Sequence, residues 1–182
     1  INMLTGMAVA DNTIVLNSDG LSWRPNLHIL DACRAIQRAV ELDYRGKDLL
    51  IVNVGSDQNN LQIIDIARKV QDVVPGCQIK FLSDDPSLDQ EGLIRDRKVK
   101  SASTDTRTYQ VSFEKIETIF PGFMCEWTVE KGIKEMVDRF FFLSLNTETF
   151  NSRGFYRLQQ LEFLLANSYL SEDLVWLKSF PS

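Results

Sequence analysis

Two arginines at the edges of expected secondary structure are the side chains in this sequence best suited to bind a charged ligand. Arg24 lies between Trp23 and Pro25, and Arg107 lies just before the segment "TYQVSF". Proline lacks a backbone donor and has a fixed φ, so Arg24 has a rigid neighbour. The planar guanidinium suits bidentate binding of phosphate. Two such groups could clamp a diphosphate if the fold brings them together, whereas the simpler interpretation is that Arg24 stacks on Trp23 or pairs with a surface carboxylate.

His28 and Asp31 are also chemically competent, but structural roles explain both. A Ser-His-Asp or Cys-His site needs a nucleophile beside the base, and the spacing around His28 supplies none. We expect a packed, hydrogen-bonded histidine within a strand. Asp31 could be a ligand or a general base, but its short carboxylate fits an N-cap of the helix that follows. We therefore expect capping by Asp31.

The composition is that of an ordinary globular protein. The 182 residues are 44% hydrophobic and 25% charged, with a net charge of −5 and no cluster of lysine and arginine. This balance argues against nucleic acid and anionic membranes as partners. No apolar run approaches the roughly 18 to 20 residues that cross a bilayer, and the start does not resemble a signal peptide. We expect a cytoplasmic protein and, since residue 1 is isoleucine, a chain that begins inside a longer gene product.

The three cysteines and the single histidine exclude common metal motifs. Cys33, Cys77 and Cys125 are isolated in the sequence and form no CxxC pair. We expect three small buried side chains in a reducing environment. One histidine cannot supply an HExxH site, and we expect no metal.

The hydrophobic pattern predicts an α/β fold in which strands and helices alternate to residue 120 and helices follow. The run "LLIVNV" is nearly all apolar, as is typical of a strand covered on both faces in a parallel sheet. The polar stretch 83–107 is either a solvated loop or a lid. We expect one domain over 1–145 and a helical extension over 146–182. The expected strands are 13–17, 26–30, 49–54, 78–82 and 109–113, and the expected helices are 2–10, 32–44, 61–74, 113–120, 129–145 (capped by Thr128) and 154–167.

The signatures of dinucleotide chemistry are missing from this sequence. It contains no GxGxxG, GxxGxxG or GxxxxGK[ST] loop, and no tyrosine is followed by lysine four residues later. Such loops hold phosphates on backbone amides at a helix N-terminus. The chain by itself therefore has no dinucleotide loop and no Tyr-x-x-x-Lys proton donor.

Four segments, in order, resemble extended short-chain dehydrogenases/reductases, the NAD-dependent sugar-nucleotide epimerases and dehydratases. "LNSDGLSWRPNLHILDACRAI" resembles that family's G-D-G-x-x-x-R-D-x-V-H-V-x-D-V-x-x-A, although Pro25 replaces the usual aspartate. The matching positions are Asp19, Gly20, Arg24, His28, Asp31 and Ala35. The other three segments are "IVNVG" (F-N-V-G), "DTRTYQVSFEKI" (D-x-R-x-Y-x-V-D-x-S-K-I) and "WTVEKGIKEMVDRF" (W-x-x-x-x-G-I-x-x-x-x-x-x-F).

The resemblance covers about residues 1–142 and implies the C-terminal, substrate-binding half of such an enzyme, with a Rossmann-like fold that is incomplete here. It implies that a missing N-terminal half binds NAD(P) and carries the catalytic residues. It also implies that Arg24 contacts the phosphates of a nucleoside diphosphate sugar, that Arg107 has a similar role and that Asn2 lines the substrate cleft. The alternative is a non-catalytic, stand-alone or degenerate binding domain, and a homodimer stays an open alternative.

Overall fold

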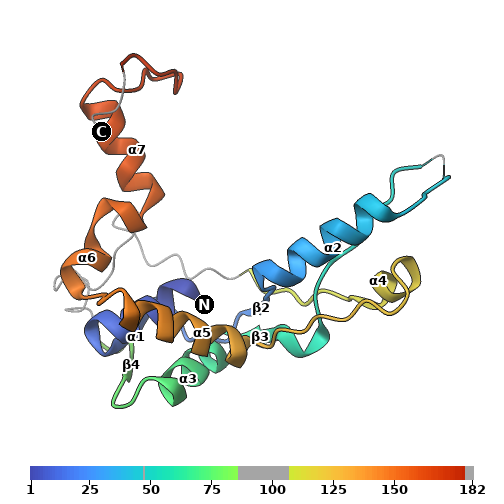
Figure 1. Cartoon of the computed structure of the whole chain (residues 1–182). Helices are drawn as coiled ribbons and strands as arrows, with labels where there is room; N and C mark the ends of the chain where they lie inside the picture. The colour runs from blue at the N-terminus through green and yellow to red at the C-terminus, as the bar shows by residue number, and fades with distance from the viewer. Residues whose placement is uncertain (47, 86–106, 179–182) are drawn as a thin grey trace. The chain divides into compact units, whose positions relative to one another are not determined.

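The computed structural model describes residues 1–46, 48–85 and 107–178, and its chain is mixed α/β (Figure 1). It divides into two compact units, Ile1–Leu145 and Asn146–Ser182. Most of the polar stretch 83–107, expected to be a solvated loop or a lid, lies outside the described residues. No helix of the described ranges has the length and apolar character needed to cross a bilayer.

The first unit is built around a pair of parallel strands. Helix α1 (Asn2–Asp11) leads directly into strand β1 (Thr13–Leu16). β1 pairs in parallel with β4 (Gln78–Phe81), so that Ile14 lies opposite Ile79. A parallel pair needs a long crossover connection, and the residues between the two strands supply it. These two strands and α1 are confirmed where the sequence predicted them.

Two long helices complete the main apolar core of this unit. Helix α3 (Ile63–Val73) lies within the predicted helix 61–74, and α5 (Val129–Phe142) begins after Thr128, whose Oγ1 accepts a hydrogen bond from the Lys131 amide. This N-cap is confirmed. The core residues come from α1, β1, α3, α5 and the residues before β4: Ala8, Ile14, Leu16, Ile64, Ala67, Val70, Val74, Cys77, Val129, Ile133 and Val137.

A second, smaller sheet fixes the backbone around Arg24. Strand β2 (Trp23–Pro25) pairs antiparallel with β3 (Asn60–Gln62), which follows the short 3-10 turn Asp57–Asn59. The turn before β2 requires glycine at position 20, where φ is +75° and a Cβ would come within 2.9 Å of the Ile64 Cβ. A residue with a side chain rarely adopts this φ, and its Cβ would also clash with Ile64.

Helix α2 (Ile29–Glu41) begins earlier than the sequence predicted. His28 is its N-cap, and the His28 Nδ1 accepts a hydrogen bond from the Leu30 amide at 3.3 Å. The predicted strand 26–30 and the predicted capping by Asp31 are therefore both wrong. A short apolar run is ambiguous between strand and helix, and here the helix takes up its last two residues, Ile29 and Leu30, which places Asp31 inside the first turn.

Two other predicted strands are extended segments without strand pairing in the described structure. Residues 49–54 and 109–113 have no ladder. Helix α4 (Glu114–Ile119) follows the second segment and starts after Phe113, as expected. A second apolar cluster joins α2, α4 and these segments: Ala35, Phe113, Ile116, Phe120 and Phe123, with Val52, Val54 and Val111 packed against it. Side-chain packing therefore replaces backbone pairing in this part of the unit.

The second unit is a short helical segment with its own aromatic contacts. Helix α6 (Thr147–Asn151), a 3-10 turn (Arg153–Phe155) and helix α7 (Arg157–Ala166) follow one another. The predicted helix 154–167 therefore starts three residues too early. Phe150 is buried, with its ring centroid 5.6 Å from that of Phe155.

We expect a small, pH-dependent contribution to stability from the ion pair between Lys69 of α3 and Glu130 of α5. The hydrogen bond from Lys69 lowers the pKa of the Glu130 carboxyl. Glu130→Gln should lower the free energy of unfolding at neutral pH by less than ~1 kcal/mol, because the pair is partly exposed. Since the folded-state pKa is lowered, this contribution is complete above the ordinary value of 4.5 and is lost as the pH falls through the lowered pKa.

Urea denaturation of both proteins at neutral pH and in acid measures this contribution. In acid the Glu130 carboxyl is protonated in both states, and the two unfolding curves should coincide. A difference that persists in acid would contradict the assignment.

Candidate functional site

A cavity of about 260 Å³ lies among the start of α1, the residues before α2 and the start of α5. Amide side chains and aromatic rings share its wall, which includes Asn2, Asn26, His28, Asn59, Trp127 and Met136. Cavities that combine apolar surface with a few placed polar groups are typical of small-molecule sites. This cavity is therefore the candidate binding site of the first unit.

The aromatic part of the wall is a stacked pair, His28 on Trp127. Their ring centroids are 3.8 Å apart and the planes differ by 6°. The His28 Nε2 lies 3.0 Å from Oε2 of Glu135, and the Lys131 ammonium lies 4.1 Å from the Trp127 ring centroid. Because Nδ1 accepts the Leu30 amide hydrogen, the neutral ring carries its proton on Nε2 and donates it to Glu135. Both nitrogens are therefore occupied, as suits a structural histidine.

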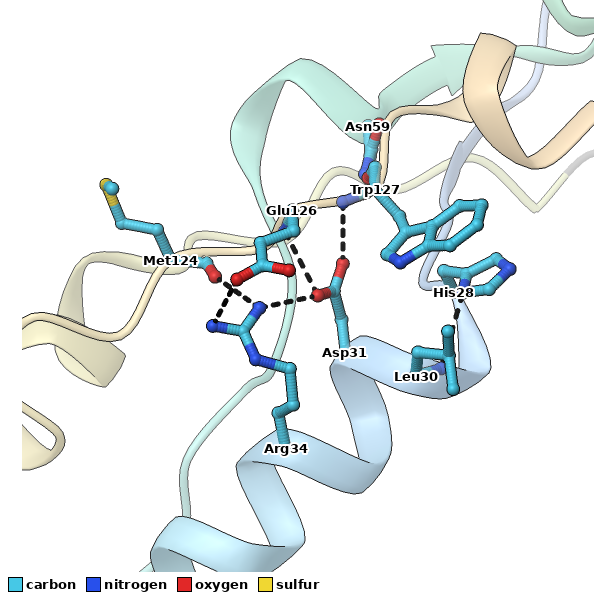
Figure 2. Close-up of polar contacts among 8 residues, drawn as sticks. All are labelled: His28, Leu30, Asp31, Arg34, Asn59, Met124, Glu126 and Trp127. Carbon is cyan, nitrogen blue, oxygen red and sulfur yellow. Dashed lines mark hydrogen bonds and ion pairs between the residues drawn. The ribbon is translucent and has the colours of Figure 1, made fainter.

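Asp31 fixes the backbone that carries Trp127 (Figure 2). Its carboxylate is fully buried and accepts the amides of Glu126 and Trp127, each at 3.0 Å. The guanidinium of Arg34 donates to Asp31 at 3.2 Å and to the Met124 carbonyl at 3.2 Å. A buried carboxylate is costly unless its oxygens are paired, and these contacts pair it. Sequence reasoning missed this role because the partners of Asp31 lie 95 and 96 residues away.

Two asparagines hold other segments beside this backbone. The Asn59 Nδ2 donates to the Trp127 carbonyl at 2.9 Å. The Asn26 Nδ2 donates to the carbonyls of Asn59 at 3.0 Å and Arg24 at 2.9 Å. Asn26 and Asn59 both line the cavity, so a chain of side-chain bonds connects its wall to strand β2.

Arg24 is half-buried and contacts the backbone of Arg107. Its Nη1 donates to the Arg107 carbonyl at 2.5 Å, across 83 residues of sequence, and to the Trp23 carbonyl at 2.7 Å. The guanidinium carbon lies 5.4 Å from the centroid of the Tyr109 ring. The Trp23 amide also donates to Thr108 Oγ1 at 3.1 Å. Segment 107–109 thus lies alongside β2, a proximity that the sequence could not establish.

The three predicted site residues fall into two groups. Asn2, the first residue of α1, lines the cavity. In the described structure neither Arg24 nor Arg107 is on the cavity wall. Asn26, two residues after Arg24 in the sequence, does line the cavity. Arg107 is exposed. The arginines are therefore joined at an edge next to the cavity and not inside it.

The cysteines and acidic residues of the described part of the chain do not form the cluster that a metal centre needs. Over residues 1–46, 48–85 and 107–178, no group of three or more His, Cys, Asp and Glu side chains could hold an ion. Cys33 is exposed, which contradicts the prediction that all three cysteines are buried. Burial raises the pKa of the Cys77 and Cys125 thiols, so both are poor nucleophiles at neutral pH.

Comparison with protein-family models and with curated proteins gives no match for this chain. The resemblance to extended short-chain dehydrogenases/reductases therefore depends on the four quoted segments. In the first unit, residues of these segments contact one another: Asp31 bonds the Trp127 amide, Arg24 bonds the Arg107 carbonyl, and the Asn53 side chain bonds the Ser112 carbonyl at 3.3 Å.

We expect Asp31→Asn to destabilise the protein strongly. An asparagine side chain has one acceptor oxygen and cannot pair with both the Glu126 and Trp127 amides. The free energy of unfolding should fall by about 2 to 4 kcal/mol, since bonds to a charged acceptor are lost and a donor is left buried. Urea denaturation measures the loss.

Asp65→Asn is the matched control. Asp65 also pairs with an arginine three residues later on its helix, Arg68, again at 3.2 Å, but both side chains are exposed. This variant should change the free energy of unfolding by less than ~0.5 kcal/mol. Equal losses in the two variants would show that the backbone bonds of Asp31 contribute nothing beyond a surface pair.

Proposed function

We propose that this chain is the substrate-binding part of an NAD(P)-dependent epimerase, dehydratase or reductase that acts on a nucleoside diphosphate sugar. The observation that carries the proposal is the position of Arg24. Its guanidinium is half-buried, bonded to the Arg107 backbone and two residues from a wall residue of the cavity. The resemblance of the quoted segments to the sugar-nucleotide enzymes supports the same function.

Arg24 has the properties of a phosphate-binding group. Two carbonyl oxygens hold Nη1 in place, and the guanidinium carbon lies over the Tyr109 ring. These carbonyls fix the orientation of the guanidinium. A side chain that is already ordered loses less entropy when it binds a ligand. Because the Arg107 backbone is bonded to Arg24, a second cationic side chain originates at the same edge, which favours a diphosphate over a single phosphate.

The cavity is suited to one ring of such a ligand. About 260 Å³ is below the roughly 300 to 1,000 Å³ of sites that enclose a whole drug-sized molecule. The amide groups of Asn2, Asn26 and Asn59 are donors and acceptors for hydroxyl groups or base edges, and Met136 and the part of Trp127 on the wall are apolar. In the proposed mode of binding, a sugar or base occupies the cavity and the diphosphate extends toward Arg24.

The chemistry of the reaction is proposed to lie outside this chain. A nicotinamide cofactor would accept and return hydride, and this sequence has neither a dinucleotide loop nor a Tyr-x-x-x-Lys motif. The role of these residues is therefore to bind and orient the substrate. The chain alone should bind ligand without turnover.

The second candidate is a non-catalytic, stand-alone or degenerate domain that binds a nucleotide or a partner protein. The absence of the catalytic motifs from this sequence favours it. The coding sequence ahead of Ile1 distinguishes the two candidates, because the enzyme requires a dinucleotide-binding half. Turnover of UDP-, dTDP- or GDP-hexoses by the intact gene product, followed through NAD(P)H absorbance or sugar analysis, separates an active from a degenerate enzyme.

We expect Arg24→Ala to weaken binding of UDP-, dTDP- or GDP-sugars roughly 10- to 100-fold, the loss typical of a charged hydrogen bond. Isothermal titration calorimetry of the intact gene product measures the dissociation constants. The control is Arg68→Ala, which removes an exposed guanidinium paired with Asp65 on the surface of α3. Equal affinity of the wild type and Arg24→Ala, with both folded by circular dichroism, would overturn the phosphate role.

A further inference from the structure

Gly132 is a glycine within helix α5 whose backbone conformation does not call for glycine. Its amide donates to the Thr128 carbonyl at 3.1 Å, so it belongs to the regular hydrogen-bonded part of the helix. Its φ lies outside the left-handed region that favours glycine. In a regular helix, glycine lowers the folding equilibrium constant about two- to fivefold relative to alanine. The local structure of α5 gives nothing in return for this loss.

Close packing does not explain Gly132 either. A Cβ built on it would have a single heavy atom of the described residues within 4 Å, the His28 Cδ2 at 3.5 Å, which is an ordinary van der Waals contact. Gly55 shows the contrast, because a Cβ there would come within 2.4 Å of the Phe113 ring. An alanine at position 132 therefore fits without displacing a described neighbour.

The space beside Gly132 is the cavity of the first unit. Gly132 and Met136 of α5 both line it, as does His28, the residue that a Cβ at position 132 would touch. A side chain at this position would therefore extend into the cavity along the edge of the His28 ring. Because the cavity measures only about 260 Å³, such a side chain would take space that a ligand needs.

The Trp127 ring does not offer a ligand an open face. His28 lies parallel to it at 3.8 Å and covers one face, as Figure 2 shows. The Lys131 ammonium lies over the same ring, 4.1 Å from the centroid, and takes the other face because the imidazole fills the first. A ligand ring cannot stack on Trp127, but it can lie against the α5 backbone at Gly132, where no side chain stands in its way.

The composition of the wall limits the charge of the group that lies there. Among the wall residues that the structure describes, none has a carboxylate, ammonium or guanidinium side chain. A charged group would lose its hydration in the cavity without gaining a counterion. The part of a ligand next to Gly132 is therefore an uncharged ring with hydrogen-bonding groups, as a hexose and a nucleobase both are.

We infer that Gly132 is a specificity-determining residue, and that an uncharged ring of the ligand packs against the α5 backbone in the space that a side chain at position 132 would fill. The class of ligand, a nucleoside diphosphate sugar, rests on the proposed function. The requirement for glycine follows from the geometry of α5 and the cavity. A substitution at this position should therefore separate stability from binding.

Two measurements on the intact gene product test the inference. Gly132→Ala should unfold at a urea concentration no lower than that of the wild type, because alanine favours the helix and has room. Calorimetry should show that Gly132→Ala binds UDP-, dTDP- or GDP-hexoses about 5- to 150-fold more weakly, because the methyl group overpacks an occupied site. Gly132→Leu should show no measurable binding.

Lys134→Leu is the matched control. Lys134 is exposed on the same helix and is not among the described wall residues. This variant should bind with wild-type affinity. Three results would overturn the inference: equal losses in Lys134→Leu and Gly132→Leu, wild-type affinity in Gly132→Leu, or a lower urea midpoint in Gly132→Ala.

The same titrations with UDP, dTDP and GDP, which lack the sugar, identify the ring beside Gly132. If Gly132→Ala weakens only the sugar nucleotides, the hexose occupies this position. If it weakens the nucleotides equally, the base occupies it. Either result supports the inference.

Failure of the inference and failure of the proposed function give different results. Sugar-nucleotide binding that Arg24→Ala weakens and Gly132→Leu leaves unchanged overturns the inference alone. If the wild type binds none of these compounds, the proposed function fails, and thermal-shift assays with free hexoses and nucleosides decide the inference. Stabilisation of the wild type but not of Gly132→Leu supports it, whereas stabilisation of both proteins or of neither overturns it.

Discussion

The buried carboxylate of Asp31 is the interaction on which the site of the first unit depends. It joins the first turn of α2 to the backbone before α5, 95 residues later, by accepting the Glu126 and Trp127 amides. A charge without solvent contact must have its oxygens paired, so the positions of both segments are fixed together. This constraint fixes the position of Trp127. Trp127 in turn supplies the ring on which His28 stacks and part of the cavity wall.

Side-chain amides do much of what backbone ladders do in other α/β folds. Asn59 bonds the Trp127 carbonyl, Asn60 bonds both the amide and the carbonyl of Val111, and Asn53 bonds the Ser112 carbonyl. These contacts hold extended segments close together without pairing their backbones in a β-ladder. The consequence is a unit with a formed cavity and, at 49–54, a strand-like edge that is open.

Local patterns were sufficient to predict the main core. The strand 13–17, the helices 61–74 and 129–145 and the threonine cap at position 128 depend on neighbours within a few residues. The structure confirms the strand, both helices and the cap, although α5 ends at Phe142 and not at residue 145. The failures have the opposite origin. Asp31 was misassigned because its partners are the distant amides of Glu126 and Trp127. His28 is packed and hydrogen-bonded as expected, but it caps α2 and is not part of a strand. Segments 49–54 and 109–113 have the composition of strands, but composition does not provide the neighbouring strand that pairing requires.

The sequence by itself determined the mixed α/β class, the helices and strands of the core, the candidate arginines and the absence of a dinucleotide loop from these residues. Only the tertiary structure decided that the backbone of Arg107 meets the side chain of Arg24, that Asn2 lines a cavity while the arginines lie beside it, and that Asp31 is a buried anchor. The reason is physical. Propensity and periodicity act over one or two turns of chain, whereas a site is made by contacts between segments about 80 to 100 residues apart, whose order in the sequence carries no distance information.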